Sequence, residues 1–331
     1  MTYKKIAQLA NVSLSTVSKA LAGSKEVSEE LTQKIIQIAM EQGYFEKKGK
    51  RKIEYTKNHA VTVAIICPEL ISLSYAWEIT AFKNEIEARG GLAAVYVYDF
   101  DATKLSDIIQ KITVRNCADG MIIYPPADFV SIPRHSIPIV GITTSHSAPY
   151  DTICCDIDAY MHDIVRYCKS LGHKQIAFVG EPHTMEKFYA YQKSLDGCGL
   201  PSREEDAYII DARFEQIGYR AAEEMLQTGK IPTAVICAYD EIALAMMHRF
   251  AEHGIHVPEQ VSVIGINDIP MAAYAQTPLT TVRTFQEEMG MTAVNLLYDK
   301  IFQATDMTQH ITIKHELVIR KSSAAPYRQE G

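Results

Sequence analysis

The sequence predicts an all-α head followed by an α/β body of two lobes, each built on a parallel, doubly wound sheet. The chain has 331 residues, about twice the length of a typical single domain. Residues 1–60 hold eleven Lys or Arg and six Glu, a formal charge of +5, whereas the rest of the chain carries −12. Apolar runs then alternate with helical segments in two successive sets, which is typical of lobes built from βα units.

The composition is that of an ordinary globular protein, with 47% hydrophobic and 22% charged residues. No apolar stretch reaches the ~20 residues that a membrane-spanning helix needs. The polar residues 1–9 do not lead into the apolar segment of a secretory signal. Seven scattered cysteines without a C-x-x-C pair favour reduced thiols over disulfides. We therefore expect a cytoplasmic protein with no membrane contact.

The head, residues 1–44, predicts three short helices. Thr2 can cap the first helix, and Asn11 follows it where a tight turn needs a left-handed backbone. Either Ser13 or Ser15 can cap the second helix, and a third amphipathic helix completes the head. Two short helices joined by a three-residue turn and braced by a third predict a helix-turn-helix.

The second predicted helix exposes short polar side chains and one cation, which suit the phosphates and base edges of a major groove. A basic head on an acidic body indicates that the head meets a polyanion. A solvated basic tail is the alternative, but such a tail would lack the helical apolar periodicity of this segment. The exposed side chains are those of Leu14, Ser15, Thr16, Ser18 and Lys19.

The head contains the strings IAQLANVSLSTVSKAL and VSEELTQKI and closes on GY. With these strings it resembles the DNA-binding head of the LacI/GalR family of bacterial transcription regulators. The resemblance implies that three side chains of the second helix face base edges and that two contact phosphates. The implied base contacts are Leu14, Ser15 and Lys19, the implied phosphate contacts are Thr16 and Ser18, and Thr2 is a further DNA-binding candidate.

The linker, residues 45–60, departs from the family pattern P-N-x-x-A-R-x-L, a short helix that orders on operator DNA. Arg51 and the apolar Ile53 match that pattern, whereas its Pro, Asn and Ala are absent. A basic run around Gly49 disfavours a preformed helix. Two interpretations stay open. The linker is either a flexible, solvated tether or a hinge that orders on DNA, with Arg51 and Ile53 in the minor groove.

The body alternates strands and helices from residue 61 onward. Two such arrays predict two parallel-sheet lobes with right-handed crossovers. Open parallel sheets bind ligands beyond the carboxyl ends of their strands, so we expect a ligand in a cleft between the lobes. The predicted strands are 61–67, 92–98, 120–124, 138–142, 175–180, 207–210, 233–238 and 261–266, and the predicted helices are 75–89, 103–114, 159–171, 185–195, 214–228 and 241–253.

The body also carries the strings SLGHKQIAFVG, PTAVICAYDEIALAMM and VPEQVSVIGINDIPMAAYAQTPLTTV, and it closes on MGMTAVNLLYDKI and HELVIRKSS. These strings resemble the effector-binding domain of the same family. The resemblance implies a periplasmic-binding-protein-like fold in which the chain crosses between the lobes three times. The implied domain spans residues 61–331, with an N-lobe of about 61–158 and 286–316 and a C-lobe of about 159–285 and 317–323.

The body lacks the common catalytic and cofactor motifs. No G-x-G-x-x-G follows the first strand, and Walker, H-E-x-x-H and G-x-S-x-G motifs are absent from the sequence. No nucleophile is spaced from a base in a recognisable catalytic pattern. We therefore expect no catalytic residue, no cofactor and no metal site, and we interpret the body as a binding domain.

The resemblance also implies positions for an effector pocket. Asp240 matches an effector-contacting Asp, Lys187 stands where an Arg often holds a ligand hydroxyl, and Tyr75 matches an aromatic residue beside the ligand. Trp77 lies near that aromatic position, and Asp268 can reach the same cleft. Two alternatives stay open, because Asp240 could merely cap the helix that follows it and Trp77 could belong to the core.

Together these features predict a homodimeric repressor that binds a pseudo-palindromic operator and responds to a small molecule, a sugar or sugar derivative. A sugar-processing enzyme on a doubly wound fold is the first alternative, and it would need catalytic residues. A secreted solute-binding protein is the second, and it would need export and would have no head.

Overall fold

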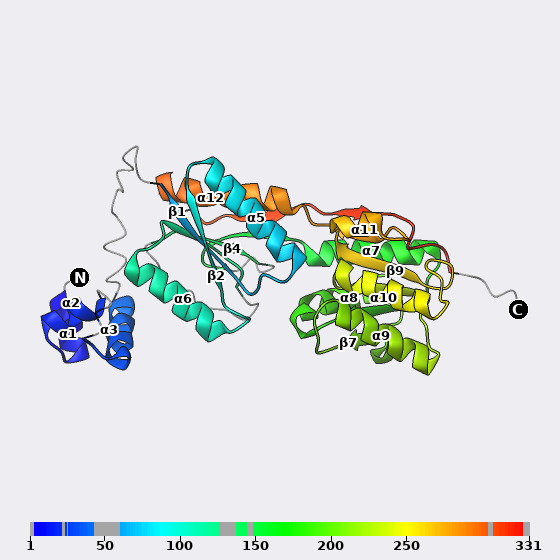
Figure 1. Ribbon diagram of the computed structural model, residues 1–331, viewed down its shortest axis with the longest axis horizontal. Helices are drawn as coiled ribbons and strands as arrows, with labels where there is room; N and C mark the ends of the chain where they lie inside the picture. The colour runs from blue at the N-terminus through cyan, green and yellow to red at the C-terminus, as the bar shows by residue number, and fades with distance from the viewer. Residues whose placement is uncertain are drawn as a thin grey trace, which may run out of the picture. The chain divides into compact units, whose positions relative to one another are not determined.

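The computed structural model describes residues 3–21, 24, 26–42, 60–125, 137–143, 148–303 and 307–326 (Figure 1). Its first part is the predicted head of three helices, whose buried side chains form one apolar cluster around Ile6, Val17 and Ile35. Each helix contributes one of these three side chains, so the helices brace one another. The helices are α1 (Tyr3–Ala10), α2 (Leu14–Leu21) and α3 (Glu29–Glu41).

The turn between α1 and α2 forms as its residue types predict. Asn11 has a left-handed backbone with φ 54°, and the next N–H, that of Val12, donates to Ala7 O at 2.9 Å. Of the two candidate caps, Ser13 is the one used, because its Oγ accepts from the Thr16 N–H at 3.1 Å. This cap fixes where α2 begins and therefore which side chains it exposes.

The first sheet of the body has the strand order β11-β5-β4-β3-β1-β2, and β2, β1, β3, β4 and β5 run parallel. The order 2-1-3-4-5 is that of a doubly wound sheet with a topological switch point between β1 and β3. Helices α5 and α12 pack against each other beside it (Figure 1). The elements are β1 (Thr62–Cys67), α5 (Leu73–Ala88), β2 (Leu92–Val97), α6 (Ala102–Arg115), β3 (Gly120–Ile123), β4 (Ile139–Ile142), β5 (Asp151–Cys155), α12 (Gln286–Gln303) and β11 (His310–Ile313).

The second sheet repeats this plan with the order β12-β10-β9-β8-β6-β7, in which only β12 is antiparallel. Its switch point lies between β6 and β8. The elements are α7 (Ile157–Leu171), β6 (Ile176–Gly180), η1 (Pro182–Thr184), α8 (Met185–Gly197), η2 (Glu204–Asp206), β7 (Ala207–Ile209), α9 (Glu215–Thr228), β8 (Ala234–Cys237), α10 (Asp240–Glu252), β9 (Ser262–Asn267), α11 (Pro270–Tyr274), β10 (Thr280–Arg283) and β12 (Glu316–Val318).

The chain divides into two compact units that exchange segments. One unit comprises Met1–Cys154 and Gln286–Ile311, and the other comprises Cys155–Phe285 and Thr312–Gly331. The first crossing lies before the predicted one because α7 begins at Ile157, where Asp156 Oδ1 accepts from the Ala159 N–H at 2.9 Å. The middle crossing lies between Phe285 and Gln286, and the last lies between Ile311 and Thr312.

Within the described residues, no helix combines the length and the apolar character needed to span a bilayer.

Candidate DNA-binding face and ligand site

Helix α2 turns one face into the head and the other outward. Val17 and Ala20 are buried against α1 and α3, whereas Leu14, Ser18 and Lys19 are exposed. Leu14 is an apolar side chain that remains 49% exposed, which suits contact with a base methyl group rather than with the core. The helix therefore presents the predicted set of side chains on an outward face.

Three hydroxyl groups join at the start of α2. Ser13 Oγ lies 2.8 Å from both Ser15 Oγ and Thr16 Oγ1. Ser15 is exposed, whereas Thr16 is half-buried beside the cap. The cap thus fixes the hydroxyl groups predicted to contact a base edge and a phosphate.

Lys19 is the cation of this face. Its ammonium group is paired with the carboxylate of Glu26, which lies in the turn before α3. The Lys19 and Glu26 side chains are 49% and 68% exposed, so solvent and salt screen the pair. Three further DNA-binding candidates, Thr2, Arg51 and Ile53, lie outside the described residues.

In the body, the site candidates of the second unit lie at the carboxyl end of its sheet. Asp240 opens α10 directly after β8 and is fully buried. Its oxygens accept from Thr281 Oγ1 at 2.5 Å and from the Ile269 N–H at 2.8 Å. Burial raises the pKa of Asp240 to about 7, although these two hydrogen bonds act in the opposite direction. A Cβ at Gly265 would overlap this carboxylate, so the neighbouring strand leaves room only for glycine.

Asp240 presents no surface in this structure because both of its oxygens are bound within the protein, and its predicted contact with a ligand stays a prediction. The alternative expectation, a helix cap, is not what forms, since Tyr239 is the N-cap residue of α10 and no side chain caps that end. Asp240 instead ties the start of α10 to the loop after β9 and to β10. The physical reason is that the side chain points across the sheet onto the space left by Gly265.

Asp268 is likewise held by the protein. Its side chain is 6% exposed and accepts from Arg283 Nε at 2.7 Å and from Arg320 Nη2 at 2.6 Å. Both Asp268 and the buried Asn267 before it have positive φ, of 54° and 115°. Strained backbone of this kind concentrates at functional sites, so this loop stays a candidate although the carboxylate itself is engaged.

Lys187, on α8, is half-buried at the carboxyl end of β8. Its Nζ donates to Ala238 O at 2.8 Å and lies 4.3 Å from the centre of the Tyr239 ring. Burial lowers the pKa of Lys187 to about 8, and the negative charge of Glu241 and Glu181 limits that decrease. The structure therefore places the Lys187 ammonium group beside the Tyr239 ring, and its predicted contact with a ligand stays a prediction.

The structure adds four residues that we did not predict as site residues. Glu181 follows β6, its side chain is 1% exposed, and it pairs with the guanidinium of Arg213. That guanidinium lies 4.3 Å from the centre of the Phe214 ring. The Phe214 and Tyr239 rings lie with their centres 5.8 Å apart, and we call these two rings the ring pair.

The ring pair and its cations follow the ends of β6, β7 and β8, on either side of the switch point. Phe214 has φ 46° and ψ −114°, a strained conformation for a bulky residue. The signal that could have found Glu181 is its position directly after an apolar strand. The pairing of Glu181 with Arg213 depends on tertiary structure and leaves no local pattern.

In the first unit, α5 brings Tyr75 to the carboxyl end of β3. Tyr75 and Tyr124 make an edge-to-face ring contact with centres 5.2 Å apart, and Tyr124 Oη donates to the buried Glu78 at 2.6 Å. Trp77, on the same helix, is half-buried, so its exposure fits both a core role and a ligand-facing role.

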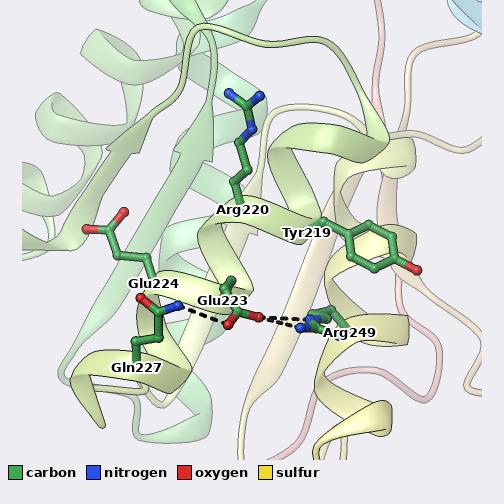
Figure 2. A pocket seen from close by; sticks show the side chains of 6 residues that line it. All are labelled: Tyr219, Arg220, Glu223, Glu224, Gln227 and Arg249. Carbon is green, nitrogen blue, oxygen red and sulfur yellow. Dashed lines mark hydrogen bonds and ion pairs between the residues drawn. The ribbon is translucent and has the colours of Figure 1, made fainter.

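A shallow, open depression of about 530 Å³ lies elsewhere on the second unit, on α9 and α10 (Figure 2). Figure 2 shows Glu223 bonded to Arg249 and to Gln227, whereas the Arg220 and Glu224 side chains point away from this pair. The lining of the depression is mostly charged and lies on helices rather than at strand ends. We therefore do not assign the ligand to it. Among the described residues, no group of three His, Cys, Asp or Glu side chains could hold a metal ion.

Comparison with known families gives two matches. Residues 2–46 match the model of bacterial regulatory proteins of the lacI family, and residues 165–323 match the model of a periplasmic binding protein-like domain. The first match covers the head described above, and the second covers most of the second unit.

Curated relatives align along nearly the whole chain. The transcriptional repressor PurR of Erwinia tasmaniensis is 28% identical over 99% of this chain and 98% of its own. The repressor CytR of Escherichia coli K12 is 26% identical over 98% of this chain and 96% of its own. Catabolite control protein A of Priestia megaterium is 26% identical over 98% of this chain and 99% of its own.

Solved structures share the fold. A regulator CelR–cellobiose complex has a TM-score of 0.71 at 23% identity and covers 97% of this chain and 99% of its own. The lac repressor dimer bound to operator and the anti-inducer ONPF has a TM-score of 0.72 at 21% identity, and the match covers 98% of this chain and 99% of its own.

Proposed function

The chain belongs to the LacI family of bacterial regulatory proteins, and from that premise we propose that it is a repressor whose affinity for operator DNA is controlled by a small molecule. It is a DNA-binding transcription regulator and not an enzyme, because its named curated relatives are transcriptional regulators. The sugar-processing enzyme and the secreted solute-binding protein are therefore set aside.

The observation that carries the DNA-binding half is the outward face of α2. We propose that Leu14, Ser15 and Lys19 contact base edges and that Thr16 and Ser18 contact phosphates. The proposed contacts of Thr2, Arg51 and Ile53 come from the sequence alone. Two heads of a homodimer would meet two half-sites of a pseudo-palindromic operator. A protein that works on chromosomal DNA belongs in the cytoplasm.

We propose that the small molecule binds at the carboxyl end of the second sheet, where Lys187 and the ring pair meet. Aromatic rings with a few convergent polar groups are the usual lining of a small-molecule site. A structure of similar fold was solved as a cellobiose complex, which supports a sugar or sugar derivative as the ligand.

Control of DNA binding requires that the ligand prefer one conformation of the protein, because equal affinity for both would shift nothing. Asp240 ties α10 to the loop after β9, so a ligand that moves this loop also moves the start of α10. Three chain crossings join this unit to the unit that contains the head. We propose that these connections couple ligand binding to DNA binding. The factor by which the ligand changes the affinity for DNA must then equal the factor by which DNA changes the affinity for the ligand.

The test uses the purified full chain. Random double-stranded DNA is enriched by repeated binding, and the selected sequences are expected to share a two-fold symmetric site. Binding to that site is then measured with and without each member of a sugar panel. Failure to select any sequence preference would contradict the DNA-binding proposal. Selection without an effect of any panel compound would contradict the proposed control by sugars.

A further inference from the structure

The two cations beside the ring pair are already bound to acceptors of the protein. Lys187 lies over Tyr239 and donates to Ala238 O at 2.8 Å. Arg213 lies over Phe214 and pairs with Glu181. Each of these two cations thus already contacts an acceptor of the protein, although the buried Nε of Arg213 makes no hydrogen bond within the described residues.

The neighbouring loop follows the same plan. Arg283 and Arg320 both bind Asp268, and Arg283 also binds Glu316 at 3.0 Å. These guanidinium groups bind protein carboxylates and hold the loop after β9 in place. An anionic ligand would have to displace a protein carboxylate to reach either of them.

Glu181 differs from Asp268, because one of its carboxylate oxygens can still accept a hydrogen bond. Its side chain is 1% exposed, and one of its oxygens pairs with Arg213. Its other oxygen, Oε2, is buried and has no hydrogen-bond partner among the described residues. A buried carboxylate oxygen without a donor is unfavourable, and a ligand hydroxyl or N–H group would satisfy it.

We infer that the ligand is uncharged where it meets the ring pair and donates a hydrogen bond to Glu181, as a neutral sugar does, and that sugar phosphates and sugar acids are rejected. This inference rests on the proposed function and narrows the class of its ligand. A ligand anion beside Glu181 would repel the carboxylate and would find Arg213 and Lys187 already engaged.

The first experiment measures the affinity of the full chain by calorimetry for matched compounds. The pairs are glucose with glucose 6-phosphate and gluconate, ribose with ribose 5-phosphate, and cellobiose with cellobionate. We expect at least one neutral member to bind and its anionic partners to bind at least tenfold more weakly. Tighter binding of an anionic member would overturn the inference, and so would the absence of any neutral ligand in the panel.

The second experiment changes the charge beside Arg213. Glu181→Gln frees the guanidinium, so the ratio of neutral to anionic affinity is expected to fall at least tenfold. Glu223→Gln is the matched control, because Glu223 pairs with Arg249 in the same way on the helical surface of Figure 2. A Glu181→Gln variant with the parent ratio, like the control, would overturn the inference.

A third variant covers the case in which Glu181→Gln fails to fold. Arg213→Gln leaves the Glu181 carboxylate without its cation, so the ratio of glucosamine to glucose affinity is expected to rise at least tenfold. An unchanged ratio in a folded Arg213→Gln variant would contradict the inference. DNA selection with the same preparations separates this outcome from failure of the proposed function, because sequence-specific DNA binding does not depend on which sugar binds.

Discussion

Lys19 on α2 is paired with Glu26 in the turn that precedes α3, so the cation predicted to contact a base already has a carboxylate partner in the head. In the contact that we propose, Lys19 exchanges this partner for DNA when the head binds. The pair is exposed and easily exchanged, yet it orients the ammonium group and places a negative charge beside the DNA-binding face. DNA affinity should therefore depend on both residues.

Lys19→Ala is expected to weaken operator binding by about 1–3 kcal/mol and to relax the preference at one base position. Affinity for unrelated DNA should fall less, because base contacts determine sequence specificity, whereas phosphate contacts position the protein on any DNA. The measurement is a pair of binding titrations, on the selected operator and on unrelated DNA, at one salt concentration. Equal losses on both would mean that Lys19 contacts only a phosphate.

Glu26→Gln is expected to strengthen DNA binding, because it removes both a competitor for Lys19 and a charge that repels phosphates. Glu30→Gln is the control, since Glu30 is exposed on α3 and its substitution changes the net charge by the same amount. The gain should exceed that of the control and should shrink as salt rises. In a Lys19→Ala background the gain should fall to that of the Glu30→Gln control, because only the removal of a repelling charge remains; an undiminished gain there would show that the pair is irrelevant to DNA binding.

Asp240 predicts a pH dependence of stability. Its pKa in the folded protein is about 7, above its ordinary value of 3.8, so the folded state keeps a proton that the unfolded state has lost. Its contribution to stability is therefore present below pH 3.8 and is lost as the pH rises through 7. Compared with Asp240→Asn, the parent should lose about 2–4 kcal/mol of unfolding free energy between pH 4 and pH 8.

Urea unfolding of both proteins at several pH values measures this difference, and other titrating groups cancel between them. A constant difference across the range would show that Asp240 keeps an ordinary pKa. Asp240→Ala should destabilise more than Asp240→Asn at pH 5, because it leaves both Thr281 and the Ile269 N–H without their acceptor.

The basic linker predicts a steep salt dependence, with about 0.9 log units of affinity lost per neutralised phosphate for each log unit of salt. Replacing Lys47 and Lys48 with Gln should flatten this slope on every DNA sequence. Ile53→Ala should instead lose affinity only on operators whose central base step is easily unstacked. If Ile53→Ala binds a stiffened operator and the original as the parent does, the linker is an electrostatic tether without a wedge.

The sequence predicted the head and the strand ends well because both depend on local patterns. Apolar spacing and the residue type at Asn11 predicted the three helices, and the alternation of apolar runs predicted the strands, whereas Lys187 was named only from the family resemblance. The direction of the Asp240 side chain could not be predicted, because it depends on space left by Gly265 on another strand. The Glu181–Arg213 pair was missed because it joins residues from two separate strand-end loops.

The exchange of segments between the two units has a consequence for synthesis on the ribosome. The first sheet gains β11 only from His310–Ile313, and the second gains β12 only from Glu316–Val318. A nascent chain can therefore complete neither sheet until almost all of it has been translated, whereas the three helices of the head are available from the start. The head can fold while the strand edges of the body are still unpaired. Unpaired strand edges favour misassembly, so the risk is highest during this period.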